Sequence, residues 1–87
     1  MYVILVYDIN VERVTKVLQV GRKYLNWVQN SVLEGEMTRA QFERLKSELK
    51  EIINEEEDSI IFYKLRTTSY MSKESLGVEK GGEDQFL

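Results

Sequence analysis

Asp8 is the residue of this chain that is best placed to do chemistry. It directly follows the apolar segment Met1 to Tyr7. The 87 residues include no histidine and no cysteine, so catalysis would have to use carboxylates, hydroxyls, lysine, tyrosine or a metal ion held by oxygen. Considered by position alone, such an aspartate more often caps a strand-to-helix junction than binds a ligand.

Basic residues follow Asp8 on a predicted helix from Val11 to Tyr24, which Asn10 is placed to cap. Its polar faces carry four cations, namely Arg13, Lys16, Arg22 and Lys23. They form either a solvated helix surface or a set of phosphate contacts, and the sequence favours neither. The net charge of −3 argues against a protein that coats nucleic acid through bulk positive charge, but it leaves local patches open.

The elements that must position these residues follow from the apolar patterns. Residues 1–7 are apolar on both alternations, which predicts a strand buried on two faces with Asp8 at its end, on the rim of a sheet. Residues 25–37 predict two short strands joined by a turn at 30–31, or one continuous strand with a bulge. Thr38 and Gln41 form a capping box that opens a second helix. The acidic run 55–58 indicates a solvated connection before another apolar strand, 58–65.

The order strand, helix, strand, strand, helix, strand predicts an α+β protein with the ferredoxin-like βαββαβ fold and an antiparallel sheet. Two helices on one face leave the other face of the sheet uncovered, and an exposed apolar face calls for a partner. We expect residues 1–66 to form this core, polar residues 67–75 to be a linker, and residues 76–87 to add a strand to the chain's own sheet or a neighbour's.

Size and composition complete the expectations. A domain of 87 residues has a marginal core, so a dimer would help to stabilise it. No apolar run is long enough to span a bilayer and no basic-then-apolar leader starts the chain, so we expect a soluble, cytoplasmic protein with no membrane contact.

Four segments in this order resemble the CRISPR-associated protein 2 family: 7–9 (Tyr-Asp-Ile), 29–36, 58–63 and 77–82. No one of these motifs is specific, and the resemblance rests on their joint spacing over nearly the whole chain. It implies the ferredoxin-like fold, a homodimer formed through the sheet faces, and a C-terminal strand lent to the partner. It also implies a role in spacer acquisition with the CRISPR-associated protein 1 integrase.

The resemblance further implies that Asp8 is the metal ligand and catalytic residue, with one copy from each subunit facing the other across the dimer axis. Mg²⁺, or Mn²⁺ in its place, would relieve the repulsion of the two carboxylates. Tyr7 and Arg13 match an aromatic and a basic position of the family. We expect Tyr7, Asn10, Arg13 and Lys16 to contact nucleic acid, with Asn10 holding a metal-bound water through its amide oxygen.

Three functions are therefore open at the level of sequence. The first is a metal-dependent endonuclease acting on RNA or DNA, with activity that rises with pH. The second is a non-catalytic DNA-binding scaffold for the integrase. The third is a small-ligand regulatory domain of similar topology, which lacks support because no glycine-rich loop follows the first strand. The closest rival family is the RNA-cleaving toxin of similar fold, of the virulence-associated protein D type.

Overall fold

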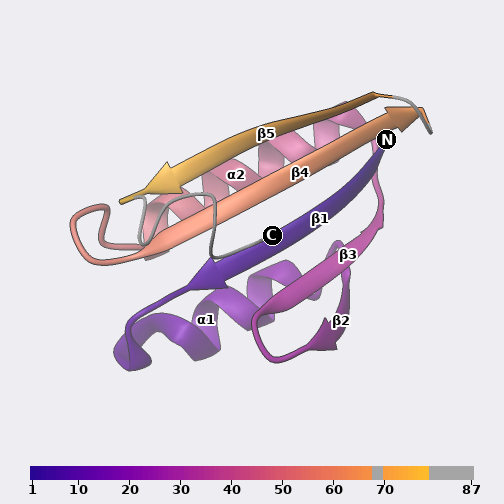
Figure 1. Cartoon of the computed structure of the whole chain (residues 1–87). Coiled ribbons are helices and arrows are strands. Elements are labelled where there is room, and N and C mark those ends of the chain that lie inside the picture. The colour runs from indigo at the N-terminus through magenta and orange to yellow at the C-terminus, as the bar shows by residue number, and fades with distance from the viewer. Residues whose placement is uncertain (68–69, 79–87) are drawn as a thin grey trace.

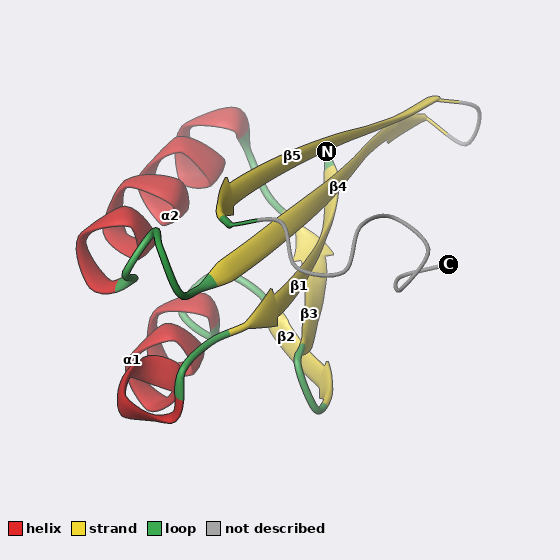
Figure 2. Ribbon diagram, turned by 60° about the vertical axis from the view of Figure 1, so that its left-hand side comes forward, coloured by secondary structure: helices red, strands yellow, loops and turns green. Residues whose placement is uncertain are grey.

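Five strands form one antiparallel sheet in the computed structural model, which describes residues 1–67 and 70–78. The sheet order is β2-β3-β1-β4-β5, and two helices lie on one of its faces (Figures 1 and 2). The elements are β1 (Tyr2–Asp8), α1 (Val11–Gly21), β2 (Asn26–Gln29), β3 (Val32–Glu36), α2 (Arg39–Ile52), β4 (Ser59–Thr67) and β5 (Tyr70–Gly77). The predicted α+β ferredoxin-like arrangement with an added strand is confirmed.

The core lies between the sheet and the helices, and β1 runs through the middle of it. Val3 and Leu5 are fully buried and Tyr7 is 6% exposed, because their side chains point toward α1 and α2. From α2, the ring of Phe42 meets Phe62 of β4 edge to face at 5.1 Å between centroids. One side of the central strand is therefore committed to the core.

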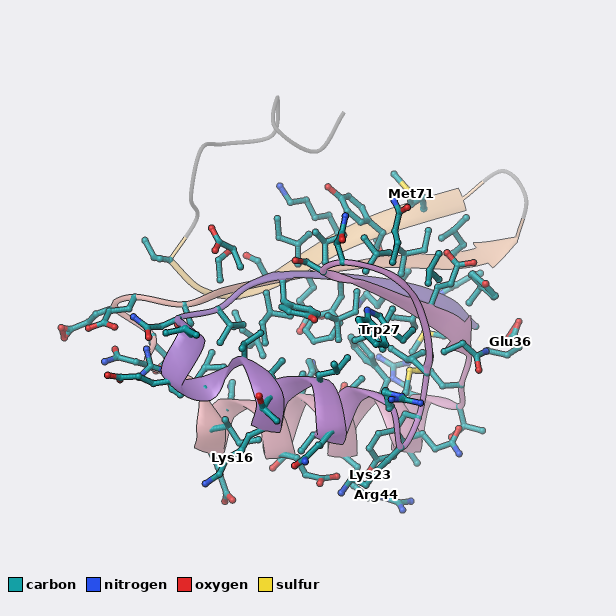
Figure 3. The ribbon with its side chains drawn as sticks, turned by 90° about the horizontal axis from the view of Figure 1, so that it is seen from below. Lys16, Lys23, Trp27, Glu36, Arg44 and Met71 are labelled. Atoms are coloured by element: carbon teal, nitrogen blue, oxygen red, sulfur yellow. The ribbon has the colours of Figure 1, made fainter. Side chains whose placement is uncertain are left out.

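The other side of β1 faces away from the helices. Tyr2, Ile4 and Val6 are only half-buried there, and their partners across β4 are Leu65, Tyr63 and Ile61. Met71 of β5 extends the same face and is 57% exposed, and Figure 3 shows it on the side of the sheet opposite the helices. We call this surface the open face. Its central part on β1 and β4 has the apolar character that the sequence predicted, whereas its edge on β3 carries acidic side chains.

Local signals in the sequence account for the turns and caps. Asn30 has φ 37°, a left-handed conformation that asparagine tolerates, and it turns β2 into β3 where a two-residue turn was predicted. The alternative of one continuous strand is wrong. The capping box of Thr38 and Gln41 is formed in both directions. Within the described residues, neither helix is long and apolar enough to cross a membrane.

Helix α1 is shorter than predicted, ending at Gly21 instead of Tyr24. Gly21 is buried, and a Cβ there would lie 2.9 Å from a methyl carbon of Leu33. A glycine in this position lets the helix approach the sheet closely, and it also weakens the helix, which stops at this residue.

The predicted linker over 67–75 is wrong for most of its length. Residues 70–77 form β5, which pairs with β4 along its whole length. Polar composition misled the prediction, because Glu74 faces the helices but is neutralised there by Lys46 of α2 at 2.6 Å and Lys64 of β4 at 2.9 Å. Of the C-terminal strand predicted over 76–87, residues 76 and 77 end β5, and residues 79–87 lie outside the described part of the chain.

Gly77 is the position in β5 where we expect a substitution to destabilise the protein most. Its φ is +79°, and an added Cβ would lie 2.0 Å from the backbone oxygen of Asp58. We expect Gly77→Ala to lower the free energy of unfolding by more than about 1 kcal/mol, measured by urea denaturation. Gly35→Ala is the control, because its Cβ would meet only an ordinary contact at 3.5 Å. Equal losses in the two variants would contradict this account of β5.

Candidate metal centre

Asp8 lies at the end of β1 where the strand leaves the sheet. It pairs in register with Ser59 of β4, and its side chain is exposed. Because side chains alternate along a strand, Asp8 shares the open face with Tyr2, Ile4 and Val6 and points away from the helices. The predicted position at the rim of the sheet is confirmed, and the face on which the carboxylate lies is now defined.

The backbone just after Asp8 is held by a second aspartate, Asp58. Its Oδ1 accepts hydrogen bonds from the backbone N–H of Asn10 at 2.8 Å and from Arg13 Nη2 at 3.2 Å. Its Oδ2 accepts from Arg13 Nε at 2.6 Å and from the backbone N–H of Asn54 at 2.8 Å. One buried carboxylate thus joins the start of α1 to the loop that precedes β4. The point of attachment at the start of α1 is Asn10, which is two residues after Asp8.

The charge of Asp58 is stabilised in this site. Burial alone would raise the pKa of its carboxyl group, but the hydrogen bonds from Arg13, Asn10 and Asn54 outweigh burial and hold the pKa at about 2, below the ordinary 3.8. The same hydrogen bond to Asp58 raises the pKa of Arg13. Both groups are therefore charged throughout the physiological pH range, and the ion pair is permanent.

Asn10 and Arg13 were both expected to contact nucleic acid, and Asn10 also to hold a metal-bound water. Their side chains instead make hydrogen bonds within the protein around Asp58. Asn10 caps α1 through its side-chain oxygen, which accepts from the backbone N–H of Glu12 at 3.0 Å, so the oxygen expected to hold water is a capping atom. The guanidinium of Arg13 donates to Asp58 and to Glu57 at 3.0 Å, and its side chain is 18% exposed. The structure places Arg13 in a structural ion pair.

The other two predicted contacts do not join Asp8 either. Tyr7 points into the core, and its hydroxyl donates to the backbone oxygen of Asn30 at 3.1 Å, so its ring is not presented to a ligand at the surface. Lys16 is exposed, but it extends from α1 away from the sheet, on the opposite side of the molecule from Met71 and the open face (Figure 3). Of the predicted site residues, Asp8 is thus the one exposed on the open face.

The donor set near Asp8 limits what can bind. Among residues 1–67 and 70–78, no group of three or more histidine, cysteine, aspartate or glutamate side chains converges on a point where a metal ion could lie. The nearby Asp58 already accepts four hydrogen bonds. One exposed carboxylate fits a hard cation such as Mg²⁺, which takes one or two protein carboxylates and keeps much of its water shell.

Sequence reasoning missed Asp58, which it assigned to a solvated acidic connection. Glu55, Glu56 and Glu57 are exposed as expected, but Asp58 is fully buried. The available signal was its place directly before the apolar strand 59–65, with an arginine in the first turn of the helix that follows β1. Only the antiparallel pairing of β1 and β4 shows that these two junctions meet.

Comparison with known proteins gives a consistent result. The family model described as CRISPR associated protein Cas2 matches residues 1–73. A protein of Dictyoglomus turgidum named CRISPR-associated endoribonuclease Cas2 is 61% identical over the full length of both chains. One of the same name from Pyrococcus furiosus is 54% identical, again over the full length of both.

Comparison with solved structures gives the same family. One titled "Crystal structure of cas2" has a TM-score of 0.75 and 43% identity, covering 93% of this chain and 91% of that one. The Streptococcus pyogenes Cas2 structure has a TM-score of 0.69 and 41% identity, covering 75% of this chain and 86% of that one.

We expect Asp58→Asn to lower the free energy of unfolding at pH 7 by about 2 kcal/mol, because it removes the charge that Arg13 and two backbone N–H groups require. The folded-state pKa of Asp58 is depressed, so its stabilisation is complete above about pH 4 and is lost as the pH falls through about 2. Urea denaturation at pH 7, 4 and 2.5 should show the two proteins converging.

Glu57→Gln is the matched control for that experiment. Glu57 contacts the same guanidinium, but its side chain is 53% exposed, so its loss should cost about 0.5 kcal/mol or less. A difference between Asp58→Asn and the unmodified protein that stays constant from pH 7 to 2.5 would show that the carboxylate's charge is not what stabilises the fold.

Proposed function

Because the chain belongs to the CRISPR-associated Cas2 family, we propose that it is a homodimeric, Mg²⁺-dependent endonuclease that acts in CRISPR adaptation. The observation that carries the catalytic part is the place of Asp8, an exposed carboxylate at the rim of the sheet on the apolar open face. The relatives from Dictyoglomus turgidum and Pyrococcus furiosus are named endoribonucleases, so RNA is the first substrate to test and DNA is the second.

Dimerisation through the open face would complete the site. The face carries half-buried apolar side chains on β1 and an exposed methionine on β5, the kind of surface that soluble monomers rarely present. A two-fold axis makes such an interface self-complementary, so each residue on it meets a surface that contains its own copy. Packing of the two open faces can therefore bring one Asp8 toward the other.

Two Asp8 carboxylates would then hold Mg²⁺, with Mn²⁺ as an alternative. When bound, the ion neutralises charge on a phosphodiester oxygen and lowers the pKa of a coordinated water, which suits a chain without histidine. The chain's own contribution is positional. Asp58 fixes the backbone at Asn10, which keeps Asp8 at the rim, and the apolar residues beside Asp8 exclude water from the interface.

The proposed cellular role is spacer acquisition together with the CRISPR-associated protein 1 integrase, in the cytoplasm. Its support is membership of the family. A non-catalytic scaffold is the second candidate. It is favoured by one observation, that the described residues of one chain gather no group of three metal-ligating side chains.

Asp8→Asn should abolish Mg²⁺-dependent cleavage of labelled single-stranded RNA, or of duplex DNA, while the protein remains folded and dimeric. We expect a loss of about 100-fold or more, since even changes to groups behind a metal ligand cost 10- to 100-fold. Glu12→Gln is the control, because Glu12 is an exposed carboxylate four residues away. Cleavage that persists in EDTA or in Asp8→Asn would contradict the catalytic proposal, and no cleavage by any form would favour the scaffold.

Ile4→Glu should convert the dimer to a monomer, because it places a charge in the middle of the open face. Sedimentation velocity measures the change, and circular dichroism checks that the monomer remains folded. Thr15→Glu adds the same charge on the exposed surface of α1 and should leave the dimer intact. A folded Ile4→Glu protein that still dimerises would show that the interface lies elsewhere.

A further inference from the structure

A cavity with basic walls lies at the end of the sheet opposite Asp8, on the side that carries the helices. It has a volume of about 260 Å³ and is lined by Met1, Arg39, Phe42, Glu43, Lys64 and Arg66. These residues come from the N-terminus just before β1, the first turns of α2 and the second half of β4, which meet at one end of the molecule (Figure 1). No step in the proposed nuclease activity uses this cavity.

The cavity lies on the helix side of the sheet and is therefore separate from the open face. Lys64 pairs in register with Val3, which faces the helices, and Arg66 is two residues further along the same strand. The cavity and Asp8 are thus on opposite faces of the sheet and at opposite ends of β1, roughly 20 Å apart along a seven-residue strand. A dimer formed through the open face leaves the cavity accessible.

The residues that line the cavity carry a net positive charge. Arg39 and Arg66 have no hydrogen bond or ion pair with any residue that the structure describes. Glu43, the one acid among the described residues that line the cavity, is paired with Lys46 at 3.3 Å. Two guanidinium groups that meet no counter-charge among residues 1–67 and 70–78, in a protein whose net charge is −3, are a local feature that the acidic composition does not suggest.

Lys64 adds a third cation that is held in place. Its Nζ donates to Glu74 at 2.9 Å and lies 5.1 Å from the centre of the Phe42 ring. An ammonium has three donors, so the hydrogen bond to Glu74 leaves others available. Two exposed guanidinium forks beside an ammonium held by Glu74 match the several oxygens of a phosphate group, which arginine binds in bidentate fashion.

We propose that this cavity is a phosphate-binding site, separate from Asp8, that takes either a free phosphate compound or a phosphate of a nucleic-acid strand. Its volume is below the roughly 300–1,000 Å³ of pockets for drug-sized ligands. It therefore accommodates a phosphate or pyrophosphate group and leaves the rest of a larger ligand outside. The recognition chemistry is the same for the two sources, and parallel titrations with pyrophosphate and with RNA separate them.

The test uses pyrophosphate as the probe, in EDTA so that no metal takes part. Titration of ¹⁵N-labelled dimer should give saturable shifts of backbone amides in 39–43 and 64–66. The double variant Arg39→Gln, Arg66→Gln should weaken binding by about tenfold or more, the effect of losing at least one charge-assisted hydrogen bond. Arg44→Gln is the matched control, since Arg44 is exposed on α2 and extends away from the sheet (Figure 3).

The second arm measures the affinity of a short fluorescent single-stranded RNA for the same proteins, also in EDTA. Weaker RNA binding by the double variant, with Arg44→Gln unchanged, identifies strand phosphates as the source. Unchanged RNA binding with weakened pyrophosphate binding identifies a free phosphate compound. The absence of saturable shifts, or an equal loss in Arg44→Gln, would overturn the proposal.

Asp8→Asn should bind pyrophosphate as the unmodified protein does. This separates the two proposals, because a failure of the nuclease activity would leave pyrophosphate binding in the cavity unaffected. Loss of pyrophosphate binding in folded Asp8→Asn would instead show that the anion binds at the rim and not in the cavity.

Discussion

The structure depends on the division of β1 into two faces. Val3, Leu5 and Tyr7 enter the core beneath the helices, and the residues between them lie on the open face together with Asp8. Because side chains alternate along a strand, a shift of one residue in register would exchange the two sets and bury the carboxylate. The burial of three apolar side chains therefore also determines that Asp8 is exposed, and on which surface.

A single buried charge secures the end of that strand. Asp58 accepts two hydrogen bonds from backbone N–H groups and two from Arg13, so it joins the start of α1 to the loop before β4. All four hydrogen-bond positions of the Asp58 carboxylate are used, so this buried ion pair fits only one arrangement of the surrounding backbone. An apolar replacement for such a pair can be equally stable. Here the arrangement that the ion pair specifies is the path of the chain immediately after Asp8.

Most of the fold could be predicted from the sequence, because its signals are local. Apolar alternation, the capping box at Thr38 and the turn at Asn30 each act within a few residues, and they place the two helices and the first four strands. The predictions that were wrong concern residues whose environment is set by partners distant in the sequence. Glu74 lies in a strand because Lys46 and Lys64 neutralise it, and Asp58 is buried because Arg13 reaches it across 45 residues. The position of Asp8 and the capping of α1 by Asn10 were predicted, whereas the role of Arg13 was obscured by the same long-range ion pair.

The central claim is that Asp8 binds a metal ion together with its copy in a second subunit, and the stoichiometry of Mn²⁺ binding tests it most directly. Electron paramagnetic resonance of Mn²⁺ titrated into the purified protein should show one tight ion for every two chains. That ion should be lost both in Asp8→Asn and in a folded monomeric variant. One ion per chain, or an ion retained by the monomer, would contradict a site shared across the two-fold axis.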